Sequence, residues 1–388
     1  MDNRYDFSDI APFDDSVFHE KMELLVREQG FEHAVRFIFP NIDFQEYAKG
    51  LLQVPDKETF QAKVMKPFLE MLVQRTTDGI TTGGFENVER GKSYAFISNH
   101  RDIVLDASFL NYCFFQHDLP TSEVAIGNNL LIYDWITDLI KLNKCFIVKR
   151  NLRLTKAFEA AKQLSAYIHY AVGEKHESVW IAQREGRAKD SNDRTQESVI
   201  KMLALEGGGS LLENLHDINI VPVSISYEYD PNDCLKAREL HIRSLDPNFK
   251  KSQRDDLCSM ETGLLQHKGR IHFEVGECIN PQLEELKSLN DKVEIVKQVC
   301  ATMDRAIHSR YHIYPINYVA YDMLEGKNEF SDKYTDEDVA KVNSYIDGQL
   351  DKVMNEPSDY NLDRKAMREI MLAMYANPLR NKIKATEA

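Results

Sequence analysis

The feature that most constrains the fold is a series of short apolar runs between residues 94 and 275, separated by stretches with helical periodicity. The runs have the length of strands, and turn-forming residues bound them. Strands that alternate with helices predict an α/β domain with a mostly parallel or mixed sheet, flanked by helices on both faces. The runs are Tyr94–Ser98, Glu123–Ile126, Lys144–Val148, Ser178–Ala182, Ile218–Ser226 and Arg270–Val275.

Helical patterns dominate on either side of this region. In residues 14–80 apolar side chains recur at a period near 3.6, with a break at Pro40. Residues 77–91 have the composition of a loop, and polar helical patterns fill most of the chain after residue 311. We therefore predict a smaller helical N-terminal domain (1–85), an α/β domain (86–310) and a helical C-terminal extension (311–388).

The charge balance and the cysteines exclude several classes of protein. The net charge of −14 argues against a nucleic-acid binder. None of the six cysteines forms a C-x-x-C pair, which favours free thiols in a reducing cytoplasm over a metal site or disulfides. No apolar run is long enough to cross a bilayer. We expect a cytoplasmic protein, with peripheral attachment to the inner face of the membrane as the alternative.

One segment departs from the acidic average. Between Lys141 and Lys156 there are six basic residues and no acidic one. Such an island on an acidic protein predicts a local anionic ligand. A solvated helix start is the alternative interpretation.

The segment Ile97–Asp106 carries the strongest candidate for catalysis. It begins at the end of an expected strand and leads into an expected helix, where α/β folds present functional groups. His100 is followed closely by carboxylates, and a carboxylate that accepts a hydrogen bond from one imidazole nitrogen leaves the other free to take a proton from a substrate hydroxyl. A structural histidine beside a helix-capping aspartate is the alternative.

The same segment resembles the first motif of the superfamily of glycerol-3-phosphate and lysophospholipid acyltransferases, Asn-His followed by four residues and an aspartate. Asn99 and His100 match this motif, and five residues rather than four separate His100 from Asp106. The resemblance implies His100 as the catalytic base and Asp106 as the carboxylate that orients it. Asp102 is the reserve for that second role.

The second motif of the family is Gly-x-x-Phe-x-x-Arg at the end of a strand. Residues Lys144–Arg150 resemble it without the glycine and keep the aromatic residue and the terminal cations. The resemblance implies that Arg150, together with Lys149, contacts the phosphate of the acceptor. Arginine suits this role because its planar guanidinium holds a phosphate in bidentate fashion.

The third motif is usually Phe-Pro-Glu-Gly-Thr-Arg. Residues Ile181–Lys189 are similar to it, although Arg187 follows Glu185-Gly186 at once. The similarity implies Arg187 as a phosphate contact, supported by Lys189. Glu185 and Gly186 would then order the substrate-binding loop. A solvated charged loop is the alternative.

The fourth motif is an apolar strand with a central proline, and Ile220–Glu228 resembles it closely. The likeness covers about residues 94–280, with the four motifs in the family's order. It implies transfer of a fatty acyl group from a thioester of coenzyme A or acyl carrier protein to a hydroxyl of glycerol-3-phosphate or a lysophospholipid, in phospholipid biosynthesis. No metal and no cofactor beyond the thioester substrate are implied.

Two alternative functions stay open. The first is a catalytically weak scaffold of the same fold that binds lipid or carrier protein, because several motifs depart from the family pattern. The second is an N- or O-acyltransferase for an amino-lipid acceptor.

The position of one apolar segment is also open. The segment Asn128–Asn143 is apolar on most faces, which favours burial. An acyl-chain tunnel and a helix that rests on a membrane surface are the alternatives for that segment.

Overall fold

The centre of the molecule is a seven-stranded mixed sheet in the order β1-β7-β6-β2-β5-β3-β4, seen in a computed structural model that describes residues 5–387. All neighbouring strands run parallel except β6 and β7, which are antiparallel. The predicted α/β class is therefore confirmed. The strands are β1 (Ile80–Gly83), β2 (Ala95–Ser98), β3 (Glu123–Gly127), β4 (Cys145–Val148), β5 (Val179–Ala182), β6 (Ile220–Tyr227) and β7 (Ile271–Val275).

Strand β1 was not predicted. It lies within residues 77–91, for which the composition predicts a loop, so that prediction is wrong for Ile80–Gly83. β1 pairs in parallel with β7 at one edge of the sheet. Its sequence, Ile-Thr-Thr-Gly, is too short to show a strand pattern, and the pairing with a distant segment makes it a strand. The sheet therefore begins ahead of residue 86, and the domain limits themselves stay a prediction.

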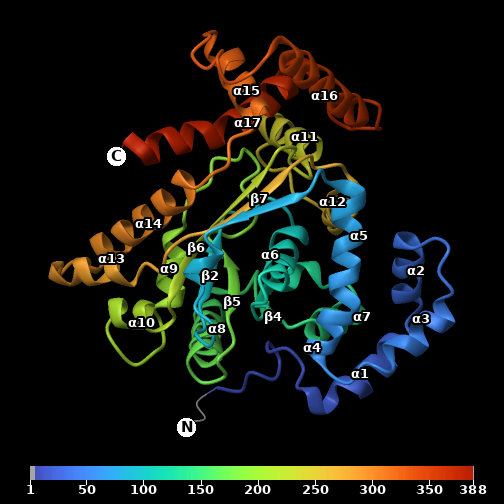
Figure 1. Cartoon of the computed structure of the whole chain (residues 1–388), viewed down its shortest axis with the longest axis vertical. Coiled ribbons are helices and arrows are strands. Elements are labelled where there is room, and N and C mark those ends of the chain that lie inside the picture. The colour runs from blue at the N-terminus through green and yellow to red at the C-terminus, as the bar shows by residue number, and fades with distance from the viewer. Residues whose placement is uncertain (1–4, 388) are drawn as a thin grey trace.

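Helices cover both faces of the sheet because successive strand residues point to opposite sides. In β2, Ala95 and Ile97 pack in one core with α8, α9, α10 and α14, whereas Phe96 packs in the other core with α5 and α6. Figure 1 shows this layered arrangement. These helices are α5 (Lys66–Thr76), α6 (Leu105–Gln116), α8 (Leu154–Gly173), α9 (Glu197–Leu203), α10 (Leu211–Asp217) and α14 (Lys292–Ser309), with the short α13 (Asn280–Glu285) ahead of α14.

The N-terminal helices form a separate apolar cluster that packs against α7 (Asp134–Leu142). Within the predicted helical region 14–80, a π-helical turn, Gln61–Met65, lies just before α5. Pro40 ends the preceding pattern as expected, since the helix before it stops at Ile38. The other helices of this cluster are α1 (Phe18–Leu25), α2 (Gln29–Ile38), α3 (Phe44–Leu51) and α4 (Lys57–Phe60).

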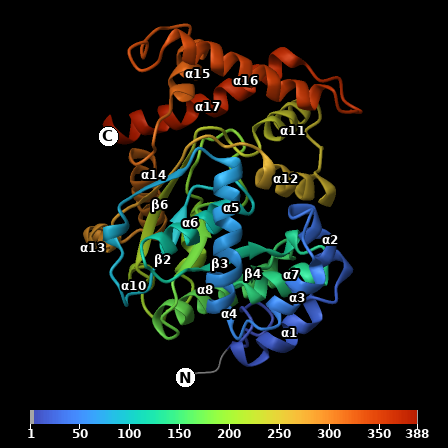
Figure 2. The same ribbon diagram turned by 45° about the vertical axis from the view of Figure 1, so that its right-hand side comes forward.

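The C-terminal helices lie at the opposite end of the molecule from the N-terminal ones (Figures 1 and 2). They share an apolar cluster with α11, which follows β6. Within residues 5–387 no helix is both long and apolar enough to cross a membrane. The helices of this cluster are α11 (Asp233–Leu245), α15 (Pro315–Glu325), α16 (Asp336–Met354) and α17 (Arg364–Glu387), whereas α12 (Gln253–Leu265) contacts α5.

Candidate active site

His100 and Asp106 form the central pair of the site. His100 follows the C-terminal end of β2, and Asp106 lies in the first turn of α6. His100 Nδ1 is 2.9 Å from Asp106 Oδ2, and the two side chains are 15% and 1% exposed. A carboxylate can only accept, so Nδ1 carries the proton. Nε2 is then the nitrogen that can meet a substrate in the cavity lined by the imidazole.

Asp106 is held in place on every side. Its Oδ2 also accepts from the backbone N–H groups of Arg101, at 2.6 Å, and Asp102, at 3.0 Å. Its Oδ1 accepts from the Tyr227 hydroxyl at 3.0 Å. These three further donors hold both oxygens of the buried carboxylate in place, so this arrangement suits a group that orients and stabilises an imidazolium.

Asp102 does not contact His100, although the sequence offered it as the alternative carboxylate to orient that histidine. Its Oδ1 accepts from the backbone N–H groups of Val104 and Leu105, both at 2.8 Å, so it caps the start of α6. Its Oδ2 accepts from Asn232 Nδ2 at 2.8 Å. Burial raises the pKa of Asp102, and the nearby charge of Asp106 adds to that rise. The histidine thus pairs with Asp106.

Asn99 fixes the loop that carries His100. Its side-chain amide exchanges two hydrogen bonds with the backbone of Ile225 on β6, at 2.8 and 2.9 Å. These bonds continue the β2–β6 pairing one residue beyond the end of β2. The backbone N–H of Ala188 donates to the His100 carbonyl at 3.2 Å, which ties the loop of the third motif to the same point.

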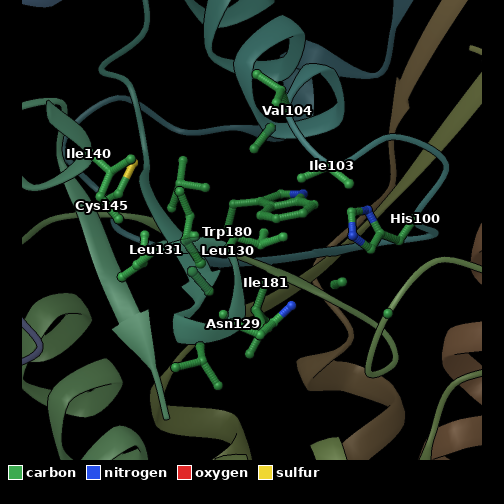
Figure 3. A pocket seen from close by; sticks show the side chains of 18 of the residues that line it. His100, Ile103, Val104, Asn129, Leu130, Leu131, Ile140, Cys145, Trp180 and Ile181 are labelled. Carbon is green, nitrogen blue, oxygen red and sulfur yellow. The ribbon is translucent and has the colours of Figure 1, made fainter. Parts of the chain in front are cut away.

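A cavity of about 950 Å³ opens beside His100. Figure 3 shows the imidazole at one end, Trp180 next to it, and the side chains of Ile140 and Cys145 at the far end. The Trp180 ring meets the imidazole edge to face at 5.8 Å, and its indole N–H donates to Ser98. The far walls are mainly apolar, so the cavity suits an apolar chain with its reactive end at the histidine.

Segments before and after the His100 loop in the sequence line this cavity. The N-terminal helices contribute Met65 from the π-helical turn and Phe68 from α5. The segment Asn128–Asn143 is half-buried, so the prediction that it is buried is wrong for most of its residues. Its apolar side chains line the cavity instead, namely those of Leu130, Leu131, Ile136, Leu139 and Ile140.

The two cations implied by the second motif line the cavity but differ in their ion pairs. Arg150 follows β4, and its Nε is 3.9 Å from Glu185 Oε1, a weak pairing across the opening. Lys149 pairs with Asp9 and donates to Gln163 at 2.9 Å. Of the two cations, Arg150 is therefore the more available to bind a ligand.

The third-motif residues line the same cavity. Arg187 Nη1 is buried and has no hydrogen-bond partner among residues 5–387, so it is ready for an anionic ligand. Lys189 pairs with Glu239. The Glu185 backbone N–H donates to Gln196 at 2.7 Å, and Gly186 has a φ of +69°, a turn conformation that favours glycine.

The cavity also contains cations that the sequence did not single out. Arg184 lines it, and its buried Nε has no partner within the described part of the chain. Arg184 lies within the third-motif segment, directly before Glu185, so its position in that segment was a signal from which it could have been predicted. Lys251 lines the cavity from the loop before α12 and bonds Asp256 at 2.9 Å. It lies outside every motif, and no sequence signal marked it.

A buried polar network connects this site to the C-terminal helices. Lys236 on α11 is fully buried and donates to the Arg101 carbonyl at 2.7 Å and to both Asp230 oxygens. The Tyr375 hydroxyl on α17 donates to Asp233 at 2.6 Å and accepts from the Asp230 backbone N–H at 3.1 Å. The C-terminal extension thus braces the loop that carries His100.

A family model covers the segment that contains this site. Residues 79–226 match the model of the family described as Acyltransferase. No curated protein matches the sequence. The 1-acyl-sn-glycerophosphate acyltransferase of Thermotoga maritima is similar over 72% of this chain and 98% of its own, at 12% identity and a TM-score of 0.33, a level that carries no information on activity or substrate.

The match contains the His100–Asp106 pair and the loop with Arg187. Within residues 5–387 no group of three or more histidine, cysteine or carboxylate side chains is arranged to hold a metal ion. The match agrees with the resemblance drawn from the sequence motifs: residues 79–226 fit the family model described as Acyltransferase.

Proposed function

We propose that this protein transfers a fatty acyl group from a thioester to a hydroxyl of glycerol-3-phosphate or a lysophospholipid, as a step of phospholipid biosynthesis. The observation that carries the proposal is the His100–Asp106 pair at the junction of an apolar cavity and a cationic rim. The apolar part suits the acyl chain, and the cations suit an acceptor phosphate.

The reaction needs one base and one acid, and His100 can be both. Nε2 takes the proton of the acceptor hydroxyl as its oxygen attacks the thioester carbonyl, which forms the new C–O bond. The tetrahedral intermediate then breaks its C–S bond, and the imidazolium returns the proton to the departing thiolate. Asp106 stabilises the imidazolium between these steps. Ester and free thiol are the products, and no other reactant is consumed.

The unpaired cations support a phosphate-bearing acceptor. Arg187 and Arg184 each have a buried nitrogen without a hydrogen-bond partner among residues 5–387, and Arg150 is only weakly paired. We assign the acceptor phosphate to Arg187 and Arg150. Lys149 and Lys189 would have to leave Asp9 and Glu239 to join them, so they serve as support.

The donor is a coenzyme A thioester or acylated carrier protein. Both are anionic, and both present a thioester at the end of a flexible arm that can reach His100. The cavity favours neither, since its apolar walls recognise only the acyl chain that the two donors share.

The intact pair of His100 and Asp106 argues against the scaffold alternative. A protein that only binds lipid needs no buried carboxylate held by three further donors beside a histidine. An amino-lipid acceptor would use the same base, so the acceptor panel below distinguishes it.

The test is release of free thiol from palmitoyl-coenzyme A and from palmitoyl carrier protein, with glycerol-3-phosphate, lysophosphatidate and amino-lipid acceptors. His100→Ala should lower acceptor-dependent release by about 10²–10⁴ because general base catalysis contributes that much. His216→Ala is the matched control, since His216 is half exposed on α10. Equal activity of His100→Ala and wild type would refute the role of His100, and no acceptor-dependent release by wild type would refute the reaction.

A further inference from the structure

The loop before α8 and the first turns of that helix carry exposed apolar side chains. Leu154 is 91% exposed, Phe158 51% and Leu152 36%. Leu154 and Phe158 stand one turn apart, so they project from the same face of α8. The fold does not explain this exposure, because burial of large apolar side chains is what stabilises a folded protein.

Basic side chains surround these residues. Arg153 and Lys156 are exposed, and neither forms an ion pair or side-chain hydrogen bond within the described residues 5–387. Lys162 Nζ lies 4.8 Å from the centre of the Phe158 ring. Glu159 is the one acidic residue between positions 149 and 162 of a chain whose net charge is −14. We call Leu152, Arg153, Leu154, Lys156 and Phe158 the α8 surface.

The α8 surface adjoins the cavity that contains His100. Leu152 itself lines the cavity, and so does Ala157, which lies between Lys156 and Phe158. Farther along the helix, Ala160 and Ala161 also face the cavity. An apolar chain that enters the cavity beside α8 would therefore pass directly over exposed apolar and basic side chains.

We propose that the α8 surface docks the protein on an anionic lipid bilayer. Leu154 and Phe158 would insert between the lipid chains, and Arg153 and Lys156 would contact the headgroup phosphates. The apolar and basic side chains alternate over a few residues, which is the arrangement that an anionic interface accommodates. This assignment is independent of the reaction proposed above.

An acidic protein, such as a carrier protein, is the competing partner for the same cations. Protein interfaces bury their anchors in complementary pockets and surround them with a matched polar rim. Here the leucine projects almost completely from the surface, and the residues beside it are a loop and a helix start. A projecting side chain of this kind fits a deformable hydrocarbon layer better than a rigid protein surface.

The experiment is co-sedimentation of the full chain with vesicles of phosphatidylcholine alone and of equal parts phosphatidylcholine and phosphatidylglycerol. Leu154→Ser/Phe158→Ser should weaken binding to the anionic vesicles at least about tenfold. The matched control is Leu245→Ser/Val293→Ser, two residues that are 51% and 52% exposed on α11 and α14. The control variant should bind as wild type does.

A second variant tests the charges. Arg153→Gln/Lys156→Gln should weaken binding to anionic vesicles about tenfold or more, and added salt should remove this difference. Binding to a carrier protein is measured in parallel. The proposal is overturned by absence of wild-type binding, by equal loss in the control variant, or by unchanged vesicle binding with weakened carrier-protein binding. Because no turnover is measured, these results are independent of the reaction.

Discussion

Replacement of Asp106 by asparagine tests the geometry of the pair most directly. Three donors converge on Oδ2, from His100 Nδ1 and from the backbone of Arg101 and Asp102. These donors would select the amide oxygen for that position, since an NH2 group there would face the backbone N–H groups of Arg101 and Asp102. The amide nitrogen would then face the Tyr227 hydroxyl, which can rotate to accept. The variant should therefore keep the fold and the tautomer and lose only the charge.

The loss of activity follows from that charge. His100 and Asp106 are mostly buried, and Nδ1 lies 2.9 Å from Oδ2. Two unit charges about 4 Å apart interact by about 4 kcal/mol at an effective dielectric constant of about 20. This stabilisation acts only when the imidazole is protonated in the transition state. Asp106→Asn should therefore lower kcat about 10³-fold, with a small effect on KM.

The assay is acceptor-dependent thiol release, with thermal unfolding to establish that the variants fold. Asp102→Asn is the matched control, because Asp102 caps α6 and does not contact the imidazole. The amide of Asn232 can flip to present its oxygen, which has no partner among residues 5–387, to the new NH2 group. We expect kcat of Asp102→Asn within about tenfold of wild type. A larger loss for Asp102→Asn than for Asp106→Asn would refute the assigned pair.

Two further predictions concern the brace and the acceptor site. Lys236→Met leaves the buried Asp230 carboxylate without its cation, so the free energy of unfolding, measured in urea, should fall by about 3–5 kcal/mol; a change below about 1 kcal/mol would contradict the brace. Arg187→Gln should raise KM for glycerol-3-phosphate about 10- to 100-fold and leave that for glycerol unchanged, because only the former offers a charged partner. Equal effects on both acceptors would remove Arg187 from the phosphate site.

Much of the fold could be predicted from local patterns. The six apolar runs correspond to β2–β7, and the break at Pro40 separates two observed helices. These predictions succeeded because side-chain periodicity reflects the face on which an element is buried. Strand β1 was missed because its four residues show no period, and its pairing partner β7 lies far along the chain.

The candidate site was predictable in part. The order of the motifs pointed to His100 and to the cations around it, and these side chains do line one cavity. The spacing of the motifs could not show which of those cations are already engaged in ion pairs. The ion pairs of Lys149 with Asp9 and of Lys189 with Glu239 join segments that are distant in sequence. Lys251 reaches the cavity from a loop without any motif, so only the folded chain reveals it.

The sequence by itself indicated the α/β pattern, the family resemblance and His100 as the candidate base, because all three depend on local runs of residues. Only the tertiary structure decided between Asp102 and Asp106, since hydrogen-bond direction depends on how the loop is folded. It also decided that residues beyond 311 brace the loop that carries His100 through Asp233 and Lys236. Buried polar groups must find partners, and those partners come from wherever the fold brings a donor or acceptor within reach.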